Sequence, residues 1–283
     1  MLLVGILREV AFSPFQHAEN DRLILERTAR ALQRRGCRVR LISENVVGAA
    51  EIEATTIFSM CQGPRANEAL AEHERAGKLI INSPRAVQSC YRTRLSRIAR
   101  DAPLLAPTTI VDTSAEAPRE PPMPIGEHGL WVKRGDVHAT QREDVVRVRA
   151  ASEYAAALAD FRGRGITEAA VQAHVVGEVV KFYGVVGTPF FRFYTESMHN
   201  VYPVALSAAR PAIEALARRV GLEVYGGDAV ITPTGRIVVI DVNDWPSFAY
   251  YRSEAAEVIA GHVHGRAAQH AASAVGERRR NAR

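Results

Sequence analysis

The sequence predicts an α/β protein built from more than one subdomain. Over the first third of the chain, helix-like segments alternate with strand-like apolar runs, which are LLVGILR, CRVRLIS, TTIFSM and KLIINS. This alternation is typical of a parallel sheet with helices on its faces. A later stretch, GGDAVITPTGRIVVIDVNDWPSF, instead predicts two strands joined by a tight turn. With 283 residues, the chain is long enough for two or three such units.

The N-terminal helices have recognisable ends. Residues 19–35 place apolar side chains at helical spacing, and Gly36 directly after them is a typical helix terminator. After the fourth strand, Ser83 precedes Pro84. This pair predicts the start of a helix with Ser83 as its N-cap.

The carboxyl ends of the predicted parallel strands are the expected place for ligands. Arg8 follows the first strand, and Asn67 and Glu68 come shortly after the third. These side chains are therefore candidates to line a substrate pocket. For Arg8, an exposed position in a loop is an equally good interpretation.

A second unit is predicted to begin near residue 104 with the run LLAPTTIV. The segment EAPREPPMPIGEHG contains too many prolines for a helix or a central strand and is therefore a loop. The run LWVKR and a helix over residues 152–162 follow. The last unit contains the runs AAVQA, EVVKFYGVV and FFRFY, a helix over 206–220 and a closing helix over 254–262.

Oxygen-bearing side chains converge in the predicted hairpin. Asp241 and Asn243 are two residues apart on its second strand, so both point to one face. If the turn TPTG closes with Ile231 opposite Arg236, Asp228 lies diagonally across from Asp241, and a bulge in the turn would shift this by one residue. Three such ligands suit Mg²⁺, which prefers hard oxygen donors. A solvated polar face is an equally common reason for such alternation.

Lysine is rare in this chain. Of 36 Lys and Arg residues, only Lys78, Lys133 and Lys181 are lysines. A lysine kept against this bias suits a compact point charge on a phosphate. Lys133 and Lys181 lie in strand-like runs, where a cation needs an edge or a ligand, although chance retention is the competing interpretation. Lys78 starts the run KLIINS and is expected to bind no ligand.

Together these features resemble the ATP-grasp superfamily, over most of the chain. The resemblance implies an ATP-grasp fold with a Rossmann-like N-terminal domain, in which Mg-ATP binds between two α+β subdomains. The implied division is an N-terminal α/β domain at 1–88, a lid subdomain at 89–170 and a C-terminal subdomain at 171–270. A basic tail at 271–283 is expected to be disordered.

The resemblance also implies which cations contact the phosphates of ATP. The segment NSPRAVQSCYRTRLSRIA is similar to the one that carries the first lid cation. That residue would be Arg92 or Arg94, where the family often has Lys. Lys133 resembles the second lid lysine, and Lys181 would add charge on a neighbouring strand. The loop GDVHAT at 135–140 replaces the usual glycine-rich loop.

The resemblance further implies an adenine site and a metal site. The segment AAVQAHVVGE is similar to the hinge strand, and its residues implied to lie near adenine are Gln172, Ala173 and His174. The residues implied to hold the metal, Mg²⁺ or alternatively Mn²⁺, are Asp228, Asp241 and Asn243.

Two branches of the superfamily fit the motifs. RimK-type glutamate ligases, which are carboxylate–amine ligases acting through an acylphosphate, have an acidic-x-Asn motif similar to DVNDWPSF. Inositol trisphosphate kinases, which phosphorylate a hydroxyl, have Lys followed by His-Gly-Thr, similar to Lys133 with His138 here. The ligase is the main prediction, and in a kinase His138 would contact the transferred or acceptor group. A non-catalytic ATP-binding protein is a third possibility, suggested by the reduced loop.

The expected substrate is a small anionic molecule. Arg192 in FFRFY points from a strand beside the site and is predicted to orient the anionic group with its guanidinium fork. Ser247 and Tyr250 follow the metal motif and are further candidates for substrate contact.

Composition fits a cytoplasmic enzyme. Hydrophobic content of 47% and charge of 24% are ordinary globular values. The N-terminus lacks the basic flank of a signal peptide, and no apolar run approaches the roughly 20 residues of a membrane helix. The widely spaced Cys37, Cys61 and Cys90 predict reduced thiols.

The net charge of +5 and a pI of about 9.3 raise the question of nucleic-acid binding. Part of the excess lies in the terminal GERRRNAR, and aromatic residues are not interleaved with basic ones except in FFRFY. Nucleic acid is therefore a disfavoured partner, and a positive cleft for ATP accounts for the charge. No sequence feature predicts an oligomeric state.

Overall fold

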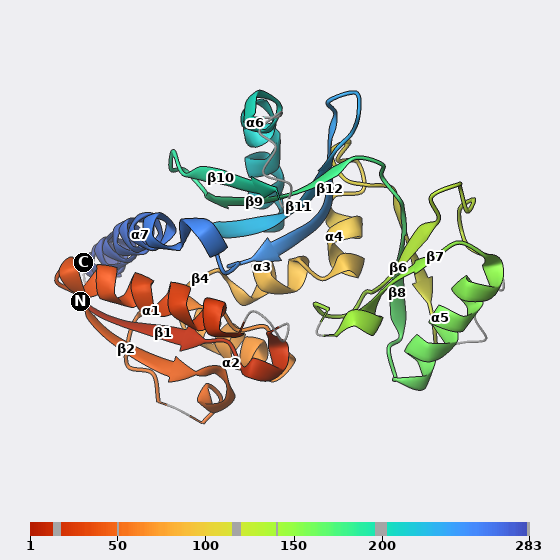
Figure 1. Ribbon diagram of the computed structural model, residues 1–283. Helices are drawn as coiled ribbons and strands as arrows, with labels where there is room; N and C mark the ends of the chain where they lie inside the picture. Colours follow the sequence, from red (N-terminus) through yellow and green to blue (C-terminus); the bar gives the residue numbers. More distant parts are fainter. Residues whose placement is uncertain (14–17, 50, 115–119, 140, 196–202, 282–283) are drawn as a thin grey trace.

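The computed structural model describes residues 1–13, 18–49, 51–114, 120–139, 141–195 and 203–281, and within them three four-stranded sheets form an α/β protein (Figure 1). Of the segments named above, residues 116–119, Thr140 and residues 282–283 of the predicted tail lie outside this description. The short 3₁₀ helices are η1 (Val10–Phe12), η2 (Glu44–Val46), η3 (Arg142–Asp144) and η4 (Ala249–Tyr251).

The N-terminal sheet is parallel, as predicted. Its strand order is β2-β1-β3-β4, with bounds β1 (Leu2–Leu7), β2 (Arg38–Ser43), β3 (Thr56–Ser59) and β4 (Leu79–Ile81). Helix α1 (Ala18–Arg34) buries Ile24, Leu25 and Leu32 on one face of this sheet. Helix α2 (Pro64–Arg75) packs on the opposite face through Leu70.

The lid sheet is antiparallel and lies to the right in Figure 1. Its order is β5-β8-β6-β7, with bounds β5 (Thr108–Asp112), β8 (Glu168–Ala173), β6 (Leu130–Arg134) and β7 (Val145–Val148). Helix α5 (Ala151–Gly163) packs on its outer face through Tyr154, Leu158 and Phe161. Since β8 pairs with β5 and β6, the predicted boundary between residues 170 and 171 falls inside a strand of the lid.

The C-terminal sheet lies between the other two. Its order is β10-β9-β11-β12, all antiparallel, with bounds β10 (Phe191–Thr195), β9 (Glu178–Val185), β11 (Val224–Ile231) and β12 (Ile237–Asp244). Helix α6 (Pro203–Val220) covers one face through Ile213 and Leu216. The same core takes in α3 (Pro84–Ser89) and α4 (Arg92–Ile98), which the sequence assigned to other units. The predicted cap of α3 is present, because Ser83 Oγ accepts from the Ala86 amide at 3.1 Å.

The β11–β12 hairpin differs from its predicted register. Ile231 lies opposite Ile237 and not Arg236, because the turn is one residue longer than expected. A bulge at Ile240 shifts the register by one residue more, so Asp228 lies directly opposite Asp241 and not diagonal to it.

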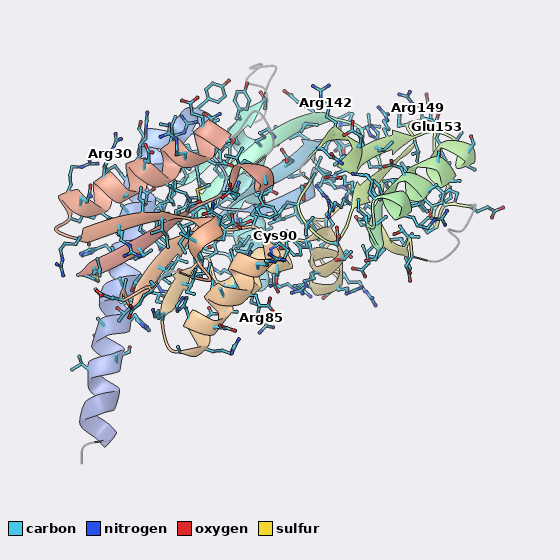
Figure 2. All side chains as sticks on the ribbon, turned by 90° about the horizontal axis from the view of Figure 1, so that it is seen from below. Arg30, Arg85, Cys90, Arg142, Arg149 and Glu153 are labelled. Carbon is cyan, nitrogen blue, oxygen red and sulfur yellow. The ribbon has the colours of Figure 1, made fainter. Side chains whose placement is uncertain are left out.

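Helix α7 (Arg252–Asn281) is much longer than the predicted closing helix over 254–262. The backbone of the predicted disordered tail is therefore helical as far as residue 281. The reason is local, since the stretch GRAAQHAASAVGE is rich in alanine, the strongest helix former. The first half of α7 packs against α1, while its far end extends away from the body of the molecule (Figure 2).

Two further observations bear on the composition. The cysteines Cys37, Cys61 and Cys90 are buried and free. In the described ranges, no helix combines the length and the apolar character needed to cross a membrane.

Candidate active site

A row of charged side chains crosses the open face of the C-terminal sheet. Lys181 on β9 lies opposite Asp228 on β11, which lies opposite Asp241 on β12. Lys181 Nζ is 2.8 Å from Asp228 Oδ1, and Arg92 at the start of α4 extends the row with Nη2 2.6 Å from Asp241 Oδ2. Of the two arginines that the sequence proposed as the first lid cation, Arg92 is therefore the one in the site. Arg94 is exposed and donates to Gln88 Oε1 at 2.6 Å.

The close approach of the strands depends on glycine. A Cβ at Gly227 would overlap the carbonyl oxygen of Asp241 and the ring of Phe182. Gly135 serves the same purpose in the lid loop, because a Cβ there would collide with Thr93 and the Glu168 backbone. The Thr93 amide and hydroxyl both donate to the Gly135 carbonyl, which fixes the loop after Lys133 onto α4.

Lys133 points from β6 toward this row. Its Nζ donates to Gln172 Oε1 at 2.7 Å and to the Ile240 carbonyl at 3.2 Å. Ile240 is the bulged residue of β12, and the bulge leaves its carbonyl available to the lid. Burial is the main reason that the pKa of Lys133 falls to about 8, with Asp241 acting in the opposite direction.

Gln172, Ala173 and His174, which the sequence predicted to form the hinge, lie at or just after the end of β8. Gln172 Nε2 donates to Thr108 Oγ1 at 3.0 Å, and the Ala173 amide donates to the Pro107 carbonyl at 3.0 Å. His174 Nδ1 accepts from Trp131 Nε1 at 3.1 Å. Burial, followed by the Arg147 charge, lowers the pKa of His174, so a neutral imidazole is favoured there.

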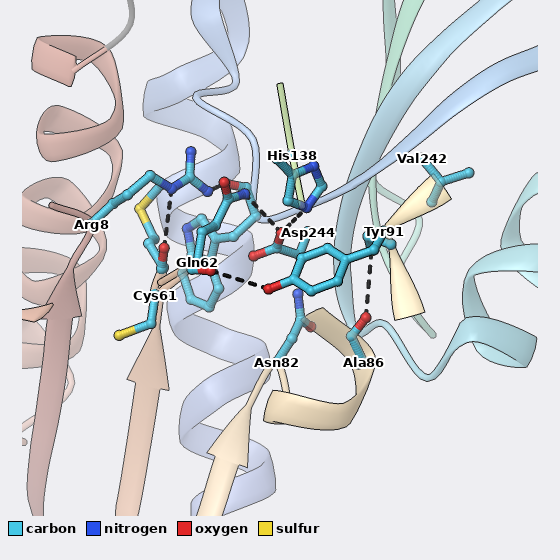
Figure 3. A network of polar contacts seen from close by, with 12 residues as sticks. Arg8, Cys61, Gln62, Asn82, Ala86, Tyr91, His138, Val242 and Asp244 are labelled. Carbon is cyan, nitrogen blue, oxygen red and sulfur yellow. Dashed lines mark hydrogen bonds and ion pairs between the residues drawn. The ribbon is translucent and has the colours of Figure 1, made fainter. Parts of the chain in front are cut away.

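A polar network connects the lid loop to the N-terminal domain (Figure 3). Its centre is Asp244, which is fully buried and accepts from Gln62 Nε2 at 3.0 Å. His138 Nε2 of the lid loop lies 3.3 Å from Asp244 Oδ1, and Tyr91 Oη donates to the Gln62 carbonyl at 3.2 Å. Sequence reasoning missed Asp244, Gln62 and Tyr91. The signal for Asp244 was its place on the apolar-facing side of β12, where a carboxylate requires partners.

Two cavities meet at this site. The larger, about 640 Å³, contains the charged row and includes His138, Asn243, Ser247 and Tyr250 in its lining. The smaller, about 570 Å³, lies between α4 and the lid and is lined in part by Gln172 and Thr108. Arg92 and Asp241 line both cavities.

Arg8 also lines the larger cavity, as its place after β1 suggested. Its guanidinium is 2.8 Å from Asp21 and donates to the Met60 carbonyl at 3.1 Å. The other candidates from that part of the sequence do not reach the cavity. Asn67 is buried and donates to the Gly63 carbonyl, whereas Glu68 is exposed.

Arg192 is not brought into the site. Its guanidinium pairs with Glu254 and stacks over the ring of Phe190. Tyr194 on the same strand lines the larger cavity, whereas Arg192 is not among the lining residues and is held by Glu254 of α7. The predicted substrate role of Arg192 therefore has no geometric support.

The residues present fit a magnesium nucleotide. Arg92 lines both cavities, and its Nε is buried without a hydrogen-bond partner, so the side chain keeps an unused donor beside them. Over the part of the chain that the structure describes, no three His, Cys, Asp or Glu side chains are grouped as a metal site. A set of two carboxylates and the Asn243 amide is nevertheless sufficient for Mg²⁺, which keeps waters and shares phosphate oxygens.

Two sheets that enclose a charged cleft, preceded by a parallel α/β domain, define the ATP-grasp fold, and comparison with solved structures shows that this chain has it. The D-alanine–D-alanine ligase from Coxiella burnetii matches with a TM-score of 0.71 at 12% identity, covering 100% of both chains. The D-alanine–D-alanine ligase from Bacillus anthracis matches with a TM-score of 0.68 at 12% identity, covering 98% of this chain and 99% of that one.

A third similar structure is the VanG D-Ala:D-Ser ligase from Enterococcus faecalis, with a TM-score of 0.61 at 13% identity over 88% of this chain and 91% of that one. No protein-family model matches the chain, and no curated protein sequence matches it. At these identities the comparison establishes the fold, and the chemistry has to be argued from the site.

Proposed function

We propose that the protein is an ATP-dependent carboxylate–amine ligase. The observation that carries the proposal is the row Lys181, Asp228, Asp241 and Arg92, set in a cleft between the two ATP-grasp sheets. The similar structures cover 88–100% of this chain and are named as D-alanine–D-alanine or D-Ala:D-Ser ligases. Their names support the ligase class and do not identify the substrates of this protein.

The cations of the row are suited to a polyphosphate. Arg92, Lys133 and Lys181 come from three elements and converge where phosphates would displace their present partners. Asp228, Asp241 and Asn243 would hold Mg²⁺, which would neutralise charge on the phosphates. Gln172, Ala173 and His174 would bound the adenine at the hinge.

The reaction has two steps. A carboxylate oxygen of the substrate attacks the γ-phosphorus of ATP, ADP leaves, and an acylphosphate results. An amine nitrogen then attacks the acyl carbon, phosphate leaves, and the amine gives up a proton. Lys133 and Arg92 stabilise the charge that develops in the first step, since buried cations act strongly where water is excluded.

The test measures ADP release with Mg-ATP and pools of carboxylates and amines. We expect release to require both a carboxylate and an amine, and hydroxylamine to trap the acylphosphate as a hydroxamate. A phosphate ester formed without any hydroxamate would overturn the ligase assignment.

That contrary result would favour a kinase that phosphorylates a hydroxyl. One observation supports this second candidate, because His138 lines the same cavity as Asp228 and Asp241 and so lies where an acceptor hydroxyl would bind. In that case a polyol phosphate alone should release ADP, and His138→Ala should abolish most of the activity. In a ligase the same substitution should cost less.

A further inference from the structure

The charged side chains of the larger cavity are almost completely paired. Arg8 pairs with Asp21 at 2.8 Å, and the charged row supplies two further ion pairs. Asp244 accepts from Gln62 and faces His138. Among the lining cations that the structure describes, Arg252 alone has no carboxylate within ion-pair distance.

The partners of Arg252 are neutral. Its Nη2 donates to Asn20 Oδ1 at 2.7 Å, and its Nε donates to the Ser247 carbonyl at 3.3 Å. These contacts hold the guanidinium in one place without cancelling its charge. Burial, followed by the neighbouring Arg27 guanidinium, lowers the pKa of Arg252, and an anion bound beside it would oppose both effects.

The segment that delivers Arg252 is held rigidly. Trp245 and Phe248 adopt positive φ angles of 31° and 52°, which bulky residues rarely do. Such conformations are strained and persist only when the surrounding packing imposes them. Both side chains are completely buried in the core shared by α1 and α7. Packing thus fixes the backbone from Asn243 to Arg252 in a strained conformation, and this segment places Arg252 at the cavity.

We propose that Arg252 is the residue that recognises the substrate, by binding an anionic group, carboxylate or phosphate, on the acceptor. The proposal rests on the proposed function and names its substrate class. Arg252 thereby takes the place that the sequence suggested for Arg192, whose guanidinium is already neutralised by Glu254. Asn20 would remain its support from α1, so the N-terminal domain would take part in substrate recognition through this contact.

The test compares matched anionic and neutral probes. The pairs are D-alanine with D-alaninamide, L-glutamate with its diamide, and inositol 1-phosphate with inositol. Binding to the full-length protein is measured by calorimetry in the presence of Mg²⁺ and a non-hydrolysable ATP analogue. We expect the wild-type protein to bind the anionic member of at least one pair more tightly than the neutral member. Arg252→Gln should weaken binding of that anionic member by roughly 10- to 100-fold and leave binding of the neutral member unchanged.

Two variants separate recognition from mere support of the fold. Arg34→Gln removes another contact between α1 and α7, since Arg34 pairs with Glu257, but Arg34 does not line the cavity. It should leave the preference for anions unchanged. Arg252→Lys keeps the positive charge but loses the paired N–H donors of the guanidinium, so it should retain part of the preference for anions.

The outcomes are distinguishable from those of the ligase test. Equal weakening of both members of a pair, no effect of Arg252→Gln, or no anion preference in wild type would each overturn the assignment of Arg252. A preference seen only for inositol 1-phosphate over inositol would support the role of Arg252 in binding anions and would favour the kinase function. If the protein released no ADP with carboxylates and amines but still preferred anions in a way that depends on Arg252, the result would count against the ligase function and not against the role of Arg252.

Discussion

At the scale of single residues, Lys133 combines two demands that conflict. It must carry a positive charge for phosphate, yet it is only 6% exposed, and burial brings its pKa to about 8. In the unliganded protein the ammonium form therefore dominates below pH 8 and is lost above it. Phosphate binding requires the charged form.

The apparent second-order rate constant kcat/KM for ATP should thus be level from pH 6.5 to 7.5. It should then fall as pH rises through about 8, approaching tenfold per pH unit. Lys133→Arg should move this fall to higher pH, because arginine keeps its charge. A wild-type profile that stays level up to pH 9.5 would contradict the assignment of Lys133.

Asp241 supports a second prediction at this scale. Asp241→Asn removes one carboxylate of the proposed metal pair and the partner of Arg92. Turnover should fall by at least about 100-fold while circular dichroism remains native. Lys78→Ala is the matched control. Lys78 donates to the Ile52 carbonyl in the N-terminal domain and lines neither cavity, so this variant should leave turnover unchanged. Normal ADP production by folded Asp241→Asn would exclude its metal role.

Sequence could identify Asp228, Asp241, Asn243 and Lys133 as site candidates because each is a polar residue in an otherwise apolar strand. It could not separate Arg92 from Arg94. Both lie on α4, and only the rotation of the helix about its axis decides which of them points into the site. It also could not find Arg252, because nothing in the sequence shows which arginines already have carboxylate partners.

At the scale of elements, the β11–β12 hairpin shows how close packing fixes the site. Gly227→Ala would force β11 away from Asp241, so the free energy of unfolding should fall by about 1–3 kcal/mol. Gly265→Ala in α7 is the control, because a Cβ there meets nothing within 4 Å and helix propensity favours alanine. Urea unfolding of both variants measures the difference. Equal stability of the two would contradict the packing argument.

The hairpin also marks the limit of sequence reasoning about elements. The two strands and their turn follow from alternation and from the Pro-Thr-Gly segment. The register does not, because a longer turn and the bulge at Ile240 are set by contacts with the lid that lie more than 60 residues away in the chain. The two deviations add up to a shift of two residues, so Asp228 and Asp241 meet on one face as expected, but directly opposite each other and not diagonally.

At the scale of the whole molecule, α7 joins the C-terminal subdomain to the N-terminal domain. Ile259 is completely buried where α7 meets α1, whereas Val275 on the projecting end is 51% exposed. Ile259→Ala should therefore lower the free energy of unfolding by about 2–4 kcal/mol, while Val275→Ala should change it by less than about 0.5 kcal/mol. Denaturant unfolding distinguishes them, and similar losses at both positions would refute this account of the helix.

The shared core of α1 and α7 also has a consequence for synthesis. A ribosome makes β1, α1 and β3 first, but one apolar face of that sheet is completed by Phe248, Ala255, Ile259 and Val263, which are made last. The N-terminal domain cannot bury this face while the rest of the chain is still being translated. Nascent chains stalled before residue 245 should consequently bind chaperones that recognise exposed apolar surface, and they should release them once α7 has emerged.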